Sequence, residues 1–246
     1  MQAIVTRNLF HLYRSTLIVA ALCFLVSHSS IAQSSKGNYN FLEFQAKPYY
    51  FGITLGYNSS DFKITHSKDF IGNDSIDNAS SITGPGFNLG IVSNLKIGQY
   101  FDFRFLPTLS FTERNLNYIY LENDKPVSNR KVESVLVELP FQARYKSAPF
   151  NDIRLFMIMG IKYSFDVASD SRARQAASIV KISPTDFAFE YGAGIQFFFP
   201  YFIFSPEIKV SNGLGNVLIF NENVKESNVL EKIRSRALTI SLHFEG

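Results

Sequence analysis

The chain has 246 residues, of which 46% are hydrophobic, 15% aromatic and 18% charged, and its formal net charge is +3. This composition is too apolar and too aromatic for a disordered protein, and the charge is too small to indicate a nucleic-acid partner. The length suits one domain or one barrel. The 25 Phe and 12 Tyr favour β-structure, because aromatic side chains are enriched in strands.

The first 32 residues have the features of a secretory signal peptide. Arg7 and Arg14 give a positively charged start, and the uncharged run LIVAALCFLV follows at residues 17–26. A bilayer-spanning helix needs about 20 apolar residues, so the run is too short to favour the alternative of a retained anchor. Ser30 and Ala32 supply the small residues that precede a cleavage site. We therefore predict a signal peptide over residues 1–32, cleaved after Ala32.

The only cysteine, Cys23, lies inside this apolar run. Phe24 and the residues after it continue the run, whereas a lipidated cysteine would follow it. We therefore expect no lipid anchor. A mature chain without cysteine can form no disulfide and can use no thiol in catalysis.

The mature chain contains eight segments in which apolar and polar residues alternate. We predict a short periplasmic segment over residues 33–48 and a β-barrel over residues 49–246. Successive side chains of a strand face opposite sides, so alternation indicates a half-buried strand. The eight predicted strands cover residues 50–58, 87–95, 101–111, 135–145, 154–165, 186–197, 202–210 and 238–245.

One face of every predicted strand is apolar and carries no charge, in a chain that is 18% charged. In the first strand this face holds Phe51, Ile53, Leu55 and Tyr57. A lipid-facing barrel requires such a face. The long connections predicted at 66–83, 115–131, 168–184 and 213–233 alternate with short ones at 97–100, 147–152 and 199–201. Because outer-membrane barrels have short periplasmic turns, this order predicts an all-β, eight-stranded antiparallel transmembrane barrel with both termini in the periplasm.

A secreted lipocalin-like barrel is the competing interpretation, with the apolar face turned inward. Two features favour the membrane barrel. The apolar face is bulky and would overfill an eight-stranded interior, and the polar face carries small residues such as Gly52, Gly160 and Gly192. Tyr57, Tyr145 and Tyr163 lie near strand ends, where aromatic girdles form.

The polar face predicts a charged lumen. Buried charges must be paired, so we expect a network that fills the barrel and leaves little room for water. Its predicted members are Asp102, Glu138, Asp166, Asp186, Glu190, Glu207, Arg104, Arg144, Arg154, Lys162 and Lys209. Three prolines, Pro107, Pro140 and Pro206, each remove a backbone donor from a strand, and we expect them at bulges or at the rim.

We predict no catalytic residue, no cofactor and no metal site. Lipid-modifying barrels place a histidine beside a serine and an acid, and the only such grouping is His66 with Ser67 and Asp69 at the start of a loop; His243 lies in the last strand. Acidic loop residues such as Asp74 and Asp77 lack a calcium-loop pattern. Basic residues of the third loop, which are predicted to be solvated or to contact anionic headgroups, are Arg172, Arg174 and Lys181.

Several segments resemble the PorT (SprT) family. They include KPYYFG at 47–52, PGFNLGI at 85–91, YFDFRFLP at 100–107 and FPYFIFSPE at 199–207. Shorter similar strings are LGYN at 55–58, Asp61-Phe62, RNL at 114–116, VES at 132–134 and RSR at 234–236. The resemblance extends over most of the mature chain, and it includes the prolines that alternation alone would not predict.

The resemblance implies an outer-membrane barrel of the type IX (Por) secretion system of Bacteroidetes, which exports proteins with C-terminal sorting domains. It implies a non-enzymatic assembly or scaffold partner, since an eight-stranded barrel is too narrow to pass folded cargo. Expected partners are outer-membrane lipid, other secretion components and, indirectly, cargo, through the loops and the segment before the barrel. The alternatives are a stand-alone structural or adhesion barrel and, less favoured, a lipid-modifying enzyme.

Overall fold

The computed structural model describes residues 39–67, 70, 76–120, 128–167, 181–220 and 225–246. Contacts divide the chain into residues 1–36 and 37–246, and all the described residues belong to the second unit. The predicted signal peptide and Cys23 lie outside the described residues. In the described residues, no helix is long and apolar enough to cross a bilayer.

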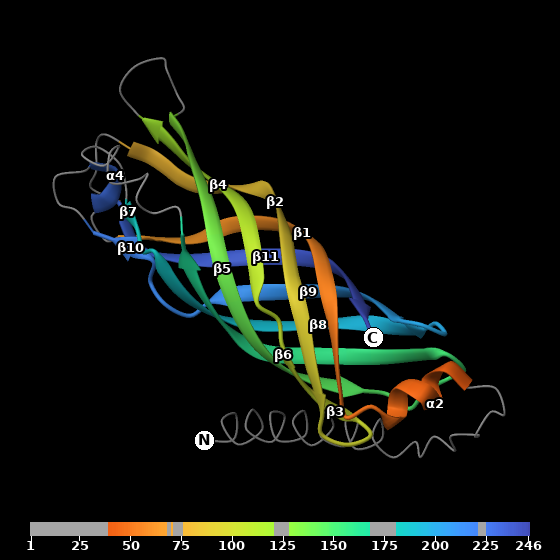
Figure 1. The fold of residues 1–246 in the computed structure, drawn as a ribbon. Helices are drawn as coiled ribbons and strands as arrows, with labels where there is room; N and C mark the ends of the chain where they lie inside the picture. Colours follow the sequence, from red (N-terminus) through yellow and green to blue (C-terminus); the bar gives the residue numbers. More distant parts are fainter. Residues whose placement is uncertain (1–38, 68–69, 71–75, 121–127, 168–180, 221–224) are drawn as a thin grey trace, which may run out of the picture. The chain divides into compact units, whose positions relative to one another are not determined.

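The second unit is built almost entirely of antiparallel strands (Figure 1). Its elements are α2 (Tyr39–Ala46), β1 (Tyr49–His66), β2 (Ile76–Lys96), β3 (Phe101–Phe105), β4 (Thr108–Tyr120), β5 (Ser128–Lys146), β6 (Ile153–Asp166), β7 (Lys181–Ile182), β8 (Thr185–Phe198), β9 (Ile203–Gly213), β10 (Leu218–Ile219), α4 (Lys225–Asn228) and β11 (Leu230–Glu245). β7 and β10 form a separate two-stranded sheet.

The main sheet closes on itself. β1 pairs with β11 on one side and with β2 on the other, and each of the remaining strands pairs with its neighbours in the order β11, β9, β8, β6, β5. β3 and β4 are consecutive halves of one strand, because both pair with β2 and with β5 in a single register. The predicted eight-stranded antiparallel barrel is therefore confirmed.

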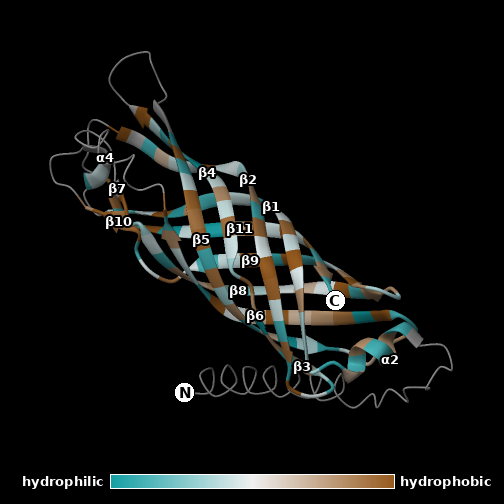
Figure 2. Cartoon of the chain, in the orientation of Figure 1, coloured by the Kyte–Doolittle hydropathy of each residue, from teal (hydrophilic) through white to brown (hydrophobic). Residues whose placement is uncertain are grey.

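The apolar face of each strand points outward. On β1, Phe51 and Ile53 are 57% and 54% exposed, whereas their chain neighbours Tyr50 and Thr54 are 3% and 4% exposed. The same alternation recurs on the other strands and appears as alternating hydrophobic and hydrophilic bands in Figure 2. A soluble barrel would bury these apolar side chains, so the lipocalin-like alternative is wrong. The outward apolar belt and closed sheet identify a transmembrane β-barrel.

The height of the apolar belt matches a bilayer. β6 has 14 residues, and at about 3.3 Å per residue with a tilt near 45° it rises about 33 Å, close to the roughly 30 Å of hydrocarbon. Aromatic side chains lie near both edges of the belt. Phe87 stacks on Phe111 at 4.5 Å between ring centroids near one edge, and Phe101 contacts Tyr145 at 5.1 Å near the other.

The short connections are confirmed at 97–100 and 147–152, and the third lies between the end of β8 and the start of β9. Gly98 adopts φ +117° in the first of these turns, a conformation that side chains disfavour. Both α2 and the C-terminal end of β11 lie at this short-turn end (Figure 1).

The long connections are shorter than predicted, because strands extend into them. β2 begins at Ile76, β4 ends at Tyr120, β5 begins at Ser128 and β11 begins at Leu230. β2 and β5 have 21 and 19 residues, about twice the 9–11 that a tilted membrane strand needs. The barrel therefore projects beyond the lipid at its long-loop end.

The projecting part has the opposite polarity to the membrane part. Its interior holds an apolar cluster, named here the cap cluster: Phe62, Ile76, Ala79, Leu116, Tyr118, Val217, Val229, Leu230 and Ile233. Its outer face begins with ion pairs, two of which join neighbouring strands and one of which lies within β5. Arg236 binds Asp61, and Lys131 lies 2.9 Å from Glu113 and 2.8 Å from Glu133. Strands that are surrounded by water bury their apolar face and expose their polar face, which is the reverse of the arrangement in lipid.

The prolines lie within the barrel wall and not at bulges, so that expectation is wrong. Register shifts fall elsewhere, at Thr65/His66 and in β2, whereas the register is unchanged across Pro107 and Pro206. At Pro107 and Pro140 only the proline's own N–H bond is lost, and the proline carbonyl still accepts a hydrogen bond. Ile91 donates to the carbonyl of Pro107 at 3.0 Å, and Leu106 donates to that of Pro140 at 3.2 Å.

We predict that a cation on the outer face is tolerated only outside the belt. Met159 lies near the middle of β6 and is 60% exposed. Met159→Arg should lower the free energy of unfolding in lipid vesicles by about 2–4 kcal/mol, because it places a charge in hydrocarbon. The matched control is Thr65→Arg, on the exposed outer face of the projecting part, which should change stability little. Urea titration measures both, and equal losses would contradict the assignment of the belt.

Candidate functional site

The lumen is the candidate site, since it collects nearly all the buried charge of the described residues. All eleven predicted lumen residues lie on the inner face; ten are buried and Asp186 is half-buried. Glycines stand at lumen positions where a larger side chain would clash with its neighbours. At Gly194 a Cβ atom would approach the ring of Phe156 to 2.3 Å, so glycine is required for that ring to lie inside.

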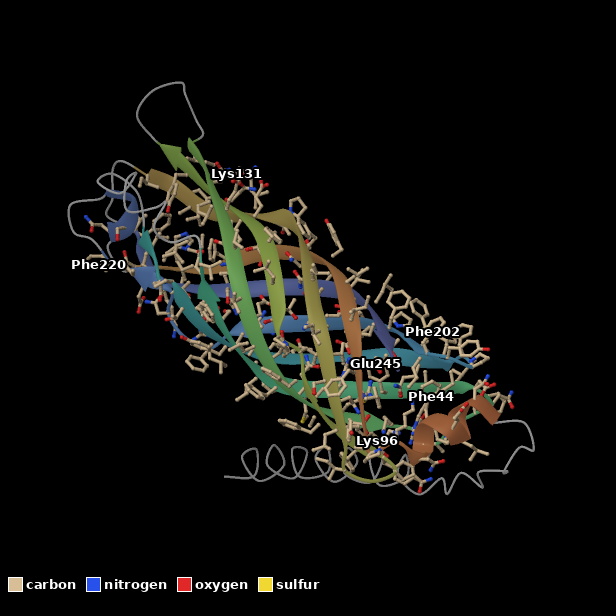
Figure 3. All side chains as sticks on the ribbon, viewed as in Figure 1. Phe44, Lys96, Lys131, Phe202, Phe220 and Glu245 are labelled. Atoms are coloured by element: carbon tan, nitrogen blue, oxygen red, sulfur yellow. The ribbon has the colours of Figure 1, made fainter. Side chains whose placement is uncertain are left out.

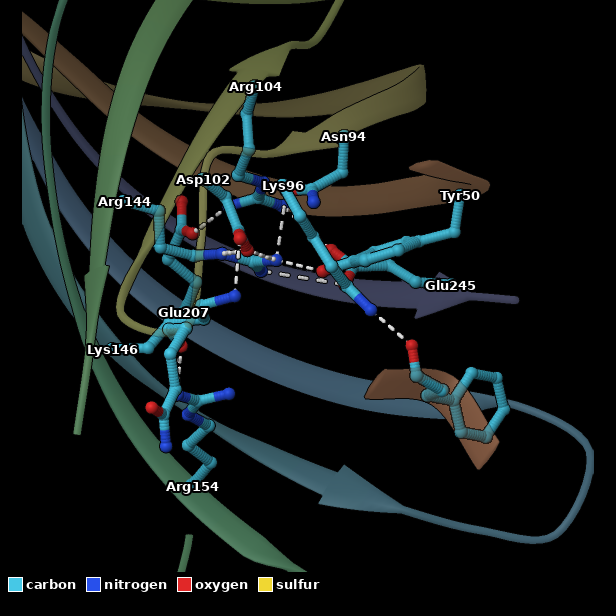
Figure 4. A network of polar contacts seen from close by, with 12 residues as sticks. Tyr50, Asn94, Lys96, Asp102, Arg104, Arg144, Lys146, Arg154, Glu207 and Glu245 are labelled. Atoms are coloured by element: carbon cyan, nitrogen blue, oxygen red, sulfur yellow. Dashed lines mark hydrogen bonds and ion pairs between the residues drawn. The ribbon is translucent and has the colours of Figure 1, made fainter. Parts of the chain in front are cut away.

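The first part of the network joins strands on opposite sides of the barrel near the short-turn end (Figure 4). The Arg104 guanidinium on β3 donates to Glu207 at 2.8 Å and to Glu245 at 2.9 Å. His243 Nε2 lies 3.4 Å from Glu207. All of these side chains are almost completely buried, so each charge depends on its partners for solvation.

Arg144 is the hub of the same network. Its guanidinium donates to Asp102 at 2.7 and 3.1 Å and to the Asn94 side-chain oxygen at 2.9 Å, and it also contacts the Tyr50 hydroxyl. Glu245 lies 3.5 Å away. Lys146 binds the other oxygen of Asp102. Two arginines thus share Glu245 and tie β3, β5, β9 and β11 together.

A second charged layer lies nearer the long-loop end. Glu190 is 3.4 Å from Lys162 and 3.4 Å from Lys209, and it accepts a hydrogen bond from Gln142 at 3.0 Å. Lys162 also binds Glu138 at 2.9 Å. Every member is buried. The layer spans β5, β6, β8 and β9 and fills the cross-section on that side.

Uncharged polar side chains continue the filling. Asn58, Asn88 and Ser110 hydrogen-bond to one another, with Ser110 donating to Asn88 at 2.8 Å. Beyond them, Ser235 donates to Asp186. A cavity of about 20 Å³ lies among these residues, which is room for about one water molecule. This section of the lumen is packed.

The short-turn end is closed by α2, which the sequence did not predict. Phe41 and Phe44 on α2 are buried against Tyr50, Phe198 and Ile203. The Phe41 and Phe198 rings meet edge to face at 5.1 Å, and Lys96 donates to the Phe44 carbonyl. The inner face of this helix is therefore occupied by the barrel, and only its outer face, with Leu42 exposed, remains for a partner. The sequence signal that could have indicated this helix is the spacing of Phe41 and Phe44, which places both side chains on one helix face.

Several lumen residues are missing from the predicted network. Glu245, Lys146, Asn94, Tyr50 and Gln142 make central contacts. Four of them stand at inward-facing positions of the predicted strands, and Lys146 follows the end of one. The alternation therefore places them inside, but it does not indicate which carboxylate meets which cation.

The histidine grouping is not assembled as a base and nucleophile. The Nε2 atom of His66 lies 3.0 Å from the Ala79 carbonyl, and the His66 ring contacts the Phe70 ring in a tilted arrangement, with 4.4 Å between the ring centroids. The Ser67 hydroxyl donates to the Asn228 carbonyl at 2.7 Å. Asp69 lies outside the described residues, as do Asp74, Arg172 and Arg174, and the side chains of Asp77 and Lys181 are not described. Within the described ranges, no group of three or more His, Cys, Asp or Glu could hold a metal ion.

In the part of the chain that the structure describes, the lipid-facing wall carries an apolar groove of about 610 Å³ over β6, β8 and β9. Met157, Ala193 and Ile208 line it, and it lies where β8 and β9 lose pairing between Gly194 and Phe197. The missing pairing coincides with Pro206, which has no N–H to donate. The groove opens on the outer wall, and its lining also includes two buried, inward-facing residues, Phe156 and Glu207.

Comparison with known families agrees with this geometry. Residues 31–218 match the family model described as outer membrane protein beta-barrel domain. The chain belongs to this family. Its outward apolar belt and its charged lumen are therefore those of an outer-membrane β-barrel, and the outer membrane is its location. No curated protein sequence is similar enough to this chain to count as a match.

Three solved structures are similar to this outer-membrane barrel at low identity. Ail, the attachment invasion locus protein of Yersinia pestis, is 14% identical, with 81% of this chain and 100% of that chain covered and a TM-score of 0.37. OprG of Pseudomonas aeruginosa is 10% identical, with coverages of 80% and 95% and a TM-score of 0.44. Neisserial surface protein A is 9% identical, with coverages of 80% and 97% and a TM-score of 0.39. Membership of the outer-membrane β-barrel family is shown by the match to the family model over residues 31–218, and these structural similarities add nothing to it.

We predict that the lumen network fails when one central cation is removed. Arg104→Leu leaves Glu207 and Glu245 without their shared partner, and an unpaired buried charge costs about 3–5 kcal/mol. The free energy of unfolding in vesicles should fall by about that amount. The matched control is Lys131→Leu, which removes an ion-paired cation from the exposed outer face and should have little effect. If both variants unfold at the wild-type urea concentration, the lumen charges do not hold the barrel together.

Proposed function

We propose that this outer-membrane barrel is a component of the type IX protein secretion system, needed for export of cargo with C-terminal sorting domains. The proposal is supported by the PorT-like strings, which include FPYFIFSPE at 199–207 and YFDFRFLP at 100–107. Both strings form wall strands of the barrel with their charged residues in the lumen network. The barrel acts as an assembly or scaffold partner.

The observation that carries the scaffold role is the filled lumen. The Arg104 and Arg144 network, the Glu190 layer and the α2 plug occupy successive levels of the interior, and the cap cluster occupies the projecting part. A conduit for protein needs a wide aqueous passage, which eight strands do not provide. The barrel therefore serves export without carrying cargo through itself.

The surface of the projecting part is the proposed site of contact with other secretion components. Exposed apolar side chains lie there beyond the membrane belt, at Leu214, Ile219 and Phe220. Figure 3 shows Phe220 and Lys131 at the end of the barrel opposite Phe44, Lys96 and Phe202. Ile219 and Phe220 are adjacent in the chain, and contiguous exposed apolar surface is the kind of surface that binds a protein partner. Since outer-membrane barrels have short periplasmic turns, we place both termini in the periplasm and this surface outside.

We propose that the barrel is not an enzyme. The Ser67 hydroxyl donates to the Asn228 carbonyl, and Nε2 of His66 faces the Ala79 carbonyl. A general base must instead reach the proton of its nucleophile. We assign no catalytic residue and no cofactor.

A stand-alone structural or adhesion barrel is the second candidate. The observation that favours it is the projecting part itself, whose rim carries the exposed ion pairs of Lys131 with Glu113 and Glu133. A rigid barrel raised above the lipid could present loops without any secretion partner. Export and co-purification distinguish the two candidates.

We predict that the purified barrel forms no large channel. In planar bilayers the packed lumen should give no stable single-channel steps, because about one water molecule fits beside Asn58 and Asn88. The matched positive control is a porin incorporated in the same bilayers. Large, long-lived conductance steps from the purified protein would show an open passage and contradict the scaffold role.

We predict that deletion of the gene abolishes export of sorting-domain cargo while lipid A stays unchanged. Cargo should accumulate in the periplasm, and export should return with the wild-type chain. Pull-down of the tagged barrel should recover other secretion components. Normal export in the deletion strain would contradict the secretion role and favour the stand-alone barrel, and an altered lipid A profile would favour the enzyme.

A further inference from the structure

A basic cavity lies between the α2 plug and the charged lumen. Its volume is about 270 Å³, several times the roughly 30 Å³ that one water molecule occupies in the liquid. Four cations line it: Lys96 at the end of β2, Lys146 at the end of β5, Arg154 at the start of β6, and the exposed Lys47 between α2 and β1. None of the described residues around it is acidic.

The cations of this cavity are only partly neutralised. Lys96 donates to the Phe44 carbonyl, and Arg154 donates to the carbonyls of Ser147 and Gln99. Neither forms an ion pair with a carboxylate among the described residues. Lys146 and Arg154 are buried, with 3% and 4% of their surface exposed. Carbonyl oxygens satisfy the N–H donors but supply no full negative charge.

The neighbouring carboxylates do not supply the missing charge. Asp102 is shared between Arg144 and Lys146, and Glu207 and Glu245 are bound by Arg104. Glu245 also lies near Arg144. Counted together, six lysines and arginines of this network and cavity, one of them the exposed Lys47, face the three carboxylates of Asp102, Glu207 and Glu245. Buried charge without compensation is unfavourable, so this arrangement favours entry of an anion.

The geometry points to one class of ligand. We propose that the cavity binds an oxyanion of the phosphate type, held by Lys96, Lys146 and Arg154. A guanidinium offers paired donors to phosphate oxygens, and two ammonium groups add compact charges. Gln196, which also lines the cavity, provides a further polar side chain. The cavity lies at the short-turn end, where Gly98 and Gln99 of the turn at 97–100 also line it.

Binding at this place would also stabilise the plug. Lys96 contacts the Phe44 carbonyl, and the Arg154 guanidinium lies 5.3 Å from the centre of the Phe41 ring. Both cations therefore touch α2 as well as the cavity (Figure 4 shows Lys96 and Arg154 with their network). An anion that neutralises them should hold α2 more firmly in the barrel end.

The phosphate could be free or could belong to a lipid headgroup, and the test separates the two sources. The protein is purified from outer membranes in an uncharged detergent and titrated with inorganic phosphate at constant ionic strength. A second titration uses phosphatidic acid in the same micelles, with diacylglycerol as the uncharged control. Saturable binding, with a rise in the urea midpoint of unfolding, is expected for phosphate, for phosphatidic acid or for both.

Two variants locate the site. Lys96→Gln combined with Arg154→Gln should weaken the observed binding at least tenfold, whereas Lys131→Gln, which removes an exposed cation of the outer face, should leave it unchanged. If the double variant does not fold, Lys96→Gln alone, at the half-exposed rim, should weaken binding several-fold. Absence of saturable binding to both ligands, or equal binding by the folded Lys96 variants and the wild type, would overturn the proposal.

Discussion

Within a lipid layer the backbone has no water to hydrogen-bond, and every strand must find a partner on both sides. The chain meets this requirement by pairing β1 with β2 and with β11, which closes the sheet. Closure turns one face of each strand to the lipid and the other to a narrow interior. The wall also accommodates Pro107 and Pro140, which lack a backbone N–H donor. The strand register continues unchanged on both sides of each proline.

The narrow interior then determines the chemistry. Side chains that cannot face lipid are forced together, and charge can be kept there only as a network. Arg104 and Arg144 perform this role by bridging strands across the barrel, with Glu245 shared between them. The same packing supports our proposal that the barrel is not itself a passage for protein. In the secretion role that we propose, the contacts with other components are therefore made by the outer surfaces of the barrel, which the charge network of the lumen supports from inside.

The sequence predicted the strands of the belt well, because a single rule, apolar outward, holds from Phe51 to Tyr57 and in seven other strands. It failed where the rule changes. On β4, the apolar residues Leu116 and Tyr118 face inward, whereas Phe111 faces outward. Because the apolar residues move from the outer to the inner face along this strand, the alternation is interrupted in the sequence and the segment resembles a loop. Individual ion pairs were beyond prediction, since Arg104 and Glu245 are 141 residues apart and meet only after closure.

The change of polarity along one strand tests the central claim most directly. If Cys23 is removed with the signal peptide, single cysteines can be introduced along β4 and β1 in an otherwise cysteine-free chain, spin-labelled and measured in vesicles for access to oxygen and to a water-soluble relaxation agent. Labels at Leu109 and Phe111 should be reached by oxygen, and labels at Glu113 and Lys63 by the aqueous agent. Aqueous access at Phe111 or Leu55 equal to that at Lys63 would contradict a lipid-facing belt.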